Sequence, residues 1–295
     1  MDINPTDPEG IVHLRYDSER PPRVFFDTNV ILGLGNKGEV MLRRLKAERG
    51  FRFRLSTQNF IELMSHLADP PSLESPNTFR KYQTAFRRIN SIFDGILPSA
   101  ESVLMSGVGL KEFTSKHWVV DGPSFQHQVE VIAKAKTLED VLEAGIRPNH
   151  YKRLREIDAQ SFLGLVAEAR DTIHDPVTDS EAGSRLIRRL YGYLIFRASS
   201  EAIHLEKLSD SQKMAVVEFF NQPGGKMFIH HFMKLVIRMI RDGAKDDGND
   251  FYDMLQLLSL ADTNLFFVTE DRRFFQYYAG PEHHRVVRWK LLCNA

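Results

Sequence analysis

The chain has almost no cysteine and no net charge. Cys293 is the single cysteine among 295 residues, so an intramolecular disulfide framework is excluded. One thiol, together with the lack of a secretory signal in MDINPTDPEG, leads us to expect a cytoplasmic protein. Lys plus Arg and Asp plus Glu both total 39, so the whole molecule has no field that would attract a polyanion. A nucleic-acid-binding surface would therefore have to be local.

Long apolar runs are also missing. The most apolar long segment is LIRRLYGYLIFRA at 186–198, which arginines interrupt and which is shorter than the roughly 20 residues of a bilayer span. We therefore expect no membrane partner. A hydrophobic content of 42% over this length is enough for a large core, in one domain or in one domain with an insertion.

The first part of the chain alternates strand-like and helix-like segments. RVFFD at 23–27 predicts a strand, DTNVILGLGNKG a loop, and EVMLRRLKAE a helix. FRFRL at 51–55 predicts a second strand, and Ser56 or Thr57 is placed to cap the helix after it. Near the C-terminus, DFYDMLQLLSLA predicts a helix capped by Asn249, LFFVTED a buried strand and RVVRWKLL a last strand. Strands at both ends of the chain, separated by helices, favour a parallel α/β sheet.

Three prolines in ADPPSLESPN at 68–77 end the first pattern, and helical periodicity dominates after them. The periodic segments are 79–93, 150–174, 180–205, 211–221 and 226–241. We therefore expect an N-terminal segment at 1–22, a catalytic core built from 23–70 and 235–295, and an α-helical insertion at 71–234. The insertion is the expected surface for substrate access, for a protein partner or for self-association.

Acidic residues stand at the ends of the predicted strands and within apolar helix faces. Asp27 ends the first strand and Asp271 follows LFFVTE, where open α/β sheets place ligand sites. Glu62 and Asp253 interrupt helix faces that otherwise look buried. Each acid alone has an ordinary explanation as a cap, a turn residue or a solvated side chain. Four acids gathered together would raise one another's pKa unless a cation offset them, and oxygen ligands without Cys or His suit Mg²⁺ or Mn²⁺.

Three segments of the chain together resemble the three acidic motifs of PIN-domain nucleases. They are FFDTNVIL, LSTQNFIELMSHL with its glutamate, and DMLQLLSLADTNLFFVTEDRRF. The resemblance implies a three-layer α/β/α sandwich around a parallel sheet, and metal-dependent phosphodiester hydrolysis, most often of RNA, that leaves a 5′-phosphate and a 3′-hydroxyl. It implies that the metal ligands are Asp27, Glu62, Asp253 and Asp271. Asp250 precedes Asp253 by about one helical turn, which leaves open whether it shares or replaces the role of Asp253. The resemblance also implies that Asn29 and Thr269 orient carboxylates or phosphate.

Pairs of basic residues, among them Arg188-Arg189 and Arg272-Arg273, are candidates for contact with a phosphate backbone. Acids balance most such pairs across the expected insertion, which favours solvated helix faces. We expect Arg272 and Arg273 to contact substrate, because they directly follow a proposed metal ligand.

Three other interpretations stay open. Gly33, Gly35 and Gly38 match the G-x-G-x-x-G pattern of a dinucleotide-binding oxidoreductase, which requires a strand directly before them. FFDTNVI also resembles the first motif of haloacid dehalogenase phosphatases, although Asn29 stands where those enzymes have a proton-donating acid. The third is a PIN-like module without catalysis that binds nucleic acid or protein.

Overall fold

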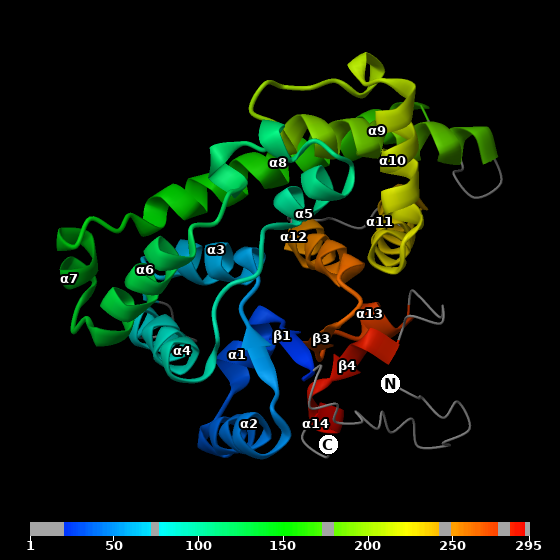
Figure 1. Ribbon diagram of the computed structural model, residues 1–295. Helices are drawn as coiled ribbons and strands as arrows, with labels where there is room; N and C mark the ends of the chain where they lie inside the picture. The colour runs from blue at the N-terminus through cyan, green and yellow to red at the C-terminus, as the bar shows by residue number, and fades with distance from the viewer. Residues whose placement is uncertain (1–20, 72–76, 173–179, 242–248, 277–283, 293–295) are drawn as a thin grey trace. The chain divides into compact units, whose positions relative to one another are not determined.

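The computed structural model describes residues 21–71, 77–172, 180–241, 249–276 and 284–292. The protein is mixed α/β and mostly helical, with one small parallel sheet of four strands among the described residues (Figure 1). The described residues form two compact units. The described residues within 1–97, 121–155 and 263–295 form the unit that holds the sheet, and those within 98–120 and 156–262 form the helical unit.

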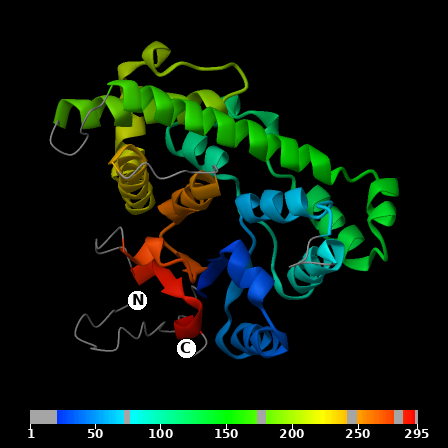
Figure 2. The ribbon, with the colours of Figure 1, turned by 180° about the vertical axis from the view of Figure 1, so that it is seen from behind.

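The sheet pairs strands from both ends of the chain in the order β2-β1-β3-β4, with every pairing parallel. The strands are β1 (Arg23–Phe26), β2 (Arg52–Arg54), β3 (Leu265–Thr269) and β4 (Val286–Arg288). Every residue of β3 is buried, as is all of β1 after its first residue, which is typical of central parallel strands. Phe25 pairs with Phe267, and their rings stack with centroids 4.9 Å apart. Figures 1 and 2 both show the blue N-terminal strand beside the orange and red C-terminal strands.

The chain leaves the two central strands in opposite directions. From β1 it passes through α1 (Thr28–Gly33) and α2 (Asn36–Arg49) to β2 on one side. From β3 it passes through α13 (Arg273–Gln276) to β4 on the other side. At such a switch point an open α/β sheet forms a ligand crevice beyond the carboxyl ends of its strands. The residues that follow β1 and β3 therefore hold the position expected for a site.

The remaining helices of the sheet unit are α3 (Thr57–His66), α4 (Thr78–Ile92), α6 (Gly122–Lys134), α7 (Leu138–Glu143), α14 (Trp289–Leu292) and the start of α8 (Pro148–Thr172). Ser56 caps α3, since its Oγ accepts a hydrogen bond from the backbone N–H of Asn59 at 3.0 Å. Gln83 of α4 donates its side-chain amide to the carbonyls of Ile132 and Ala135 at the end of α6. The first bond stabilises the start of α3, and the Gln83 bonds connect α4 to the end of α6.

The helical unit contains the rest of α8, α5 (Ala100–Gly107), α9 (Ser180–Ala198), α10 (Asp210–Asn221), α11 (Pro223–Arg241) and α12 (Asn249–Leu255). Its short 3₁₀ helices are η1 (Lys111–Phe113), η2 (Lys116–Trp118), η3 (Leu205–Lys207) and η4 (Gln256–Ala261). The described helices include none with the length and apolar character that crossing a bilayer requires.

The sequence predicted all four strands at their observed places. It was wrong at 28–33, where the predicted loop is helix α1, because Val30 and Ile31 turn inward and are buried. It was also wrong at the end of RVVRWKLL, where the strand stops at Arg288 and helix α14 follows. The boundaries predicted for the insertion do not coincide with the division into units, since α4 and α6 belong to the sheet unit.

Candidate metal centre at the strand ends

Asp27 is a buried carboxylate at the carboxyl end of β1. Its side chain is 4% exposed, and its backbone N–H donates to the carbonyl of Val268 in β3 at 2.8 Å. It holds the N-cap position of α1, but its side chain makes no capping hydrogen bond. Instead, Oδ2 accepts a hydrogen bond from the Thr269 hydroxyl at 2.8 Å. The carboxylate is therefore held across the two central strands, and helix capping does not account for it.

Glu62 reaches the same part of the sheet unit through Thr28. The Thr28 hydroxyl donates to Glu62 Oε2 at 2.6 Å and accepts a hydrogen bond from the Asn59 side-chain amide at 2.8 Å. Asn59 is fully buried, and the hydroxyl of Ser56 donates to its Oδ1. The chain of hydrogen bonds Ser56–Asn59–Thr28–Glu62 thus fixes the orientation of Glu62.

The sequence analysis did not single out Thr28 or Asn59. The available signal was their spacing, because Thr28 directly follows Asp27, and Asn59 stands one helical turn before Glu62 on α3. Both side chains are buried, at 2% and 0% exposed, so their polar groups require partners. They find those partners in each other.

Asp271 stands two residues after β3, and Arg273 engages its carboxylate. Arg273 Nε lies 2.8 Å from Oδ2 and 3.1 Å from Oδ1, and Nη2 also donates to Oδ2. The Arg273 backbone N–H donates to Oδ1 at 2.9 Å, and the Asp271 backbone N–H donates to the Thr269 hydroxyl at 3.0 Å. Asp271 therefore shapes the turn after β3, and Thr269 connects it to Asp27. The Arg273 guanidinium binds the Asp271 carboxylate in the structure, whereas the sequence led us to expect that Arg273 contacts substrate.

Among the proposed ligands in the sheet unit, Asp27 interacts electrostatically with both Glu62 and Asp271. Burial raises the pKa of Asp27 to about 6, and the negative charges of Glu62 and Asp271 add to the rise. The hydrogen bond from Thr269 favours the ionised form and opposes part of this effect. The strand ends therefore carry neighbouring negative charges that repel one another. A cation bound there would offset this repulsion and favour the ionised form of Asp27.

The other two expected ligands belong to the helical unit. Asp250 and Asp253 both lie on α12, and Asp250 Oδ2 pairs with Arg238 Nη2 at 2.6 Å. The Asp253 side chain is partly exposed. The structure therefore brings Asp27, Glu62 and Asp271 together within one unit, and it assigns Asp250 a basic partner on α11.

The remaining predicted site residues lie at the surface or pack against side chains. Asn29 on α1 and Arg272 after β3 are exposed. Residues 30–32 form helix, so the strand that a dinucleotide-binding loop requires before Gly33 is missing there. A Cβ on Gly38 would lie 3.0 Å from Leu34 Cδ2 and 3.2 Å from Trp289 Cζ2, so Gly38 allows close packing of α2.

The chemistry of the carboxylate set suits a hard divalent cation. Carboxylate oxygens are the preferred ligands of Mg²⁺ and Mn²⁺, and Thr28 and Thr269 orient two of the three acids. Over the described ranges, no three His, Cys, Asp or Glu side chains are arranged to hold a metal ion. The Asp271 carboxylate is paired with Arg273, so metal binding would require the cation to replace the Arg273 guanidinium at Asp271.

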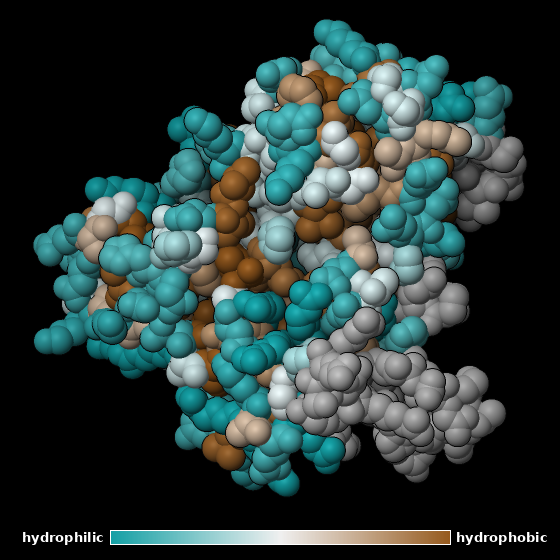
Figure 3. Space-filling model, in the orientation of Figure 1, coloured by the Kyte–Doolittle hydropathy of each residue, from teal (hydrophilic) through white to brown (hydrophobic). Residues whose placement is uncertain are grey.

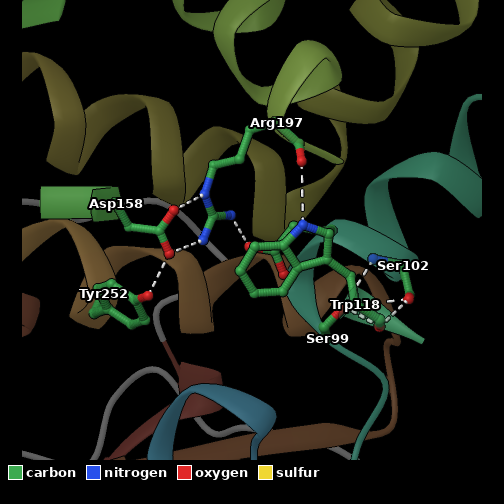
Figure 4. Close-up of polar contacts among 7 residues, drawn as sticks. Ser99, Ser102, Trp118, Asp158, Arg197 and Tyr252 are labelled. Carbon is green, nitrogen blue, oxygen red and sulfur yellow. Dashed lines mark hydrogen bonds and ion pairs between the residues drawn. The ribbon is translucent and has the colours of Figure 1, made fainter. Parts of the chain in front are cut away.

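A second charged cluster lies inside the helical unit (Figure 4). Arg197 Nε and Nη2 donate to the two oxygens of Asp158 at 2.9 and 2.7 Å, and Nη1 donates to Glu101. The Tyr252 hydroxyl donates to Asp158, and the Arg197 guanidinium lies 4.2 Å from the centroid of the Trp118 ring. The Trp118 indole N–H donates to the Arg197 carbonyl at 3.1 Å.

This cluster holds two carboxylates for one guanidinium. Burial raises the pKa of Asp158 to about 7, although the hydrogen bond from Tyr252 opposes the rise. Burial also lowers the pKa of Arg197 to about 10, so Arg197 remains charged at neutral pH. The Asp158 and Arg197 side chains are only 7% exposed and Glu101 only 2%. The cluster joins α5, α8, α9 and α12, and we assign it a structural role.

Comparison of the chain with protein-family models, with curated proteins and with solved structures finds no match.

Proposed function

We propose that the protein is a metal-dependent phosphodiesterase of PIN-like type, with RNA as its substrate. The observation that carries the proposal is the meeting of Asp27, Thr269 and Asp271 at the switch point between β1 and β3, with Glu62 held beside them through Thr28. The fold proposed with this function is a three-layer α/β/α sandwich.

The metal ligands in this proposal are the three acids of one unit, Asp27, Glu62 and Asp271. A divalent cation held by such carboxylates lowers the pKa of a water molecule and offsets charge on a phosphodiester. Thr269 keeps the Asp27 carboxylate oriented, and Thr28 does the same for Glu62. Arg273 neutralises Asp271 and becomes available for a phosphate oxygen once a cation replaces it.

The test is a cleavage assay on the full chain with 5′-labelled single-stranded RNA, in Mn²⁺ or Mg²⁺ and in EDTA. We expect cleavage only with the metal, and products with a 5′-phosphate and a 3′-hydroxyl. Asp27→Asn removes the charge but keeps the size and the Thr269 hydrogen bond, so it should abolish cleavage. Glu48→Gln changes an acid that pairs with Arg44 on exposed α2, and it serves as the matched control. Full cleavage in EDTA, or by Asp27→Asn, would refute the proposal.

The Arg273–Asp271 pairing favours one second candidate, a nucleic-acid-binding module without catalysis. In that case Arg273 is a permanent partner of Asp271 and no cation enters. RNA binding without cleavage in any divalent metal would select this candidate.

A further inference from the structure

The helical unit contains a groove of about 1060 Å³ between α8, α9, η3 and α10. This volume is slightly above the roughly 300–1,000 Å³ that ligand pockets occupy. Its lining residues come from 161–165, 188–196, 204–206 and 213–217, all within the helical unit. None of the proposed metal ligands lines it.

Basic side chains outnumber acidic ones in the lining of the groove. Arg188 and Arg189 on α9, Lys213 on α10 and His204 beside η3 line it, whereas Glu206 is the one acid among its lining residues. Lys213 lies 3.6 Å from Asp210, a fully exposed partner that constrains it little. The whole chain has a net charge of zero, so this local excess of positive charge is a feature of the groove. It fits an anionic ligand.

Aromatic side chains lie among these cations. Phe196 on α9 is 46% exposed, and its ring centroid lies 5.4 Å from that of His204. Tyr191 also lines the groove, and its ring stacks on Phe220 at 4.3 Å, which fixes its position. One exposed phenylalanine is ordinary at a protein surface, whereas a contiguous apolar patch is typical of an interaction site.

Apolar surface continues beside Phe196. Val217 lines the groove and is 44% exposed, and Met214 on the same helix is 59% exposed. Where Figure 1 shows α9 and α10, Figure 3 shows hydrophobic surface directly beside hydrophilic surface. Cations next to exposed rings form the combination that binds the phosphates and the bases of an unpaired strand.

We propose that this groove binds single-stranded nucleic acid, with phosphates against Arg188, Arg189 and Lys213 and a base stacked on Phe196. A duplex is disfavoured because its bases stack on one another and cannot reach the ring. An acidic peptide would satisfy the cations but not the exposed aromatic surface. The inference goes beyond the proposed catalytic function, since binding here requires neither metal nor cleavage.

The test measures fluorescence anisotropy of a labelled single-stranded RNA with the full chain in EDTA, over a range of salt concentrations. Arg188→Ser/Arg189→Ser should weaken binding at least tenfold and reduce the slope of log K against log salt by about 1 to 2. Phe196→Ala should weaken binding about tenfold and leave that slope unchanged, because a lost stack releases no counterions. Far-UV circular dichroism and the urea midpoint establish that each variant is folded.

The controls remove the same number of arginines, or an exposed apolar side chain, from outside the groove. Arg44→Ser/Arg153→Ser removes two exposed arginines, and Leu142→Ala removes a side chain that is 39% exposed. We expect both controls to bind as the unchanged protein does. Equal loss in the controls, equally tight binding of duplex RNA, or equal competition by polyglutamate would overturn the inference, as would failure of the unchanged protein to bind RNA.

The two proposals fail separately. Asp27→Asn is expected to keep RNA binding while it loses cleavage, and the Arg188→Ser/Arg189→Ser variant is expected to lose binding in EDTA. If Asp27→Asn loses RNA binding and the groove variants keep it, RNA binds at the strand ends. That result would refute the proposal that the groove binds RNA.

Discussion

Removal of Arg197 should be among the most destabilising single changes in the helical unit. Arg197→Met keeps most of the apolar volume but removes the guanidinium that Asp158 and Glu101 share. All three side chains are at most 7% exposed, so two carboxylates would stay buried without a partner charge. Breaking a buried pair in this way costs about 3–5 kcal/mol. We therefore expect the free energy of unfolding to fall by that amount.

Urea unfolding followed by tryptophan fluorescence measures this loss. The chain has two tryptophans, and Trp118 lies directly against Arg197. A Trp289→Phe background makes Trp118 the single reporter, so the signal comes from the helical unit. Arg185→Met removes an exposed arginine that pairs with Glu181 at 2.9 Å, and this control should cost no more than about 0.5 kcal/mol.

The pH dependence gives an independent check on the same cluster. The pKa of Asp158 is about 7 in the folded protein and 3.8 in its ordinary state, so between these values the folded state binds more protons than the unfolded state. Stability should therefore fall as pH rises from about 4 to 7, by at most about 1.4 kcal/mol per pH unit from this group.

Asp158→Asn should flatten this slope, since the asparagine amide does not titrate in this range, and it leaves one guanidinium for one carboxylate. It should also cost less at neutral pH than Arg197→Met does. A loss below about 1 kcal/mol in Arg197→Met, or an unchanged pH slope in Asp158→Asn, would refute the assignment of a buried, charge-unbalanced cluster.

Three further predictions concern the strand ends. In EDTA, Asp27→Asn should not lower the melting temperature, because burial already disfavours the ionised form of Asp27. Mn²⁺ should raise the melting temperature of the unchanged protein but not that of the variant. A lower melting temperature of Asp27→Asn in EDTA would contradict this prediction. Arg273→Gln should tighten Mn²⁺ binding in the same thermal-shift titration, since it leaves Asp271 without its guanidinium, and weaker binding would show that Arg273 does not compete with the cation. Thr28→Val removes the hydroxyl that holds Glu62 and should reduce kcat at least tenfold with little change in RNA affinity; an unchanged kcat would exclude an orienting role.

The sequence alone determined the local elements whose pattern is unambiguous. RVFF and LFFVT are short runs of buried β-type residues, and the structure has β1 and β3 there. Their place at opposite ends of the chain favoured a parallel sheet, and the sheet is parallel. The acids Asp27 and Asp271 were visible because each follows such a run.

The tertiary structure decided which polar groups meet. Thr28 and Asn59 are 31 residues apart, and Asp27 and Thr269 are 242 apart, so no local pattern relates the members of either pair. Helix α1 likewise forms where the sequence read as a loop, because burial of Val30 and Ile31 outweighs their weak helix propensity. The groove on α9 and α10 also depends on the fold, since its basic and aromatic residues read one by one as solvated or core helix positions. Sequence fixes the chemistry that each position offers, and packing alone brings distant positions within hydrogen-bonding distance.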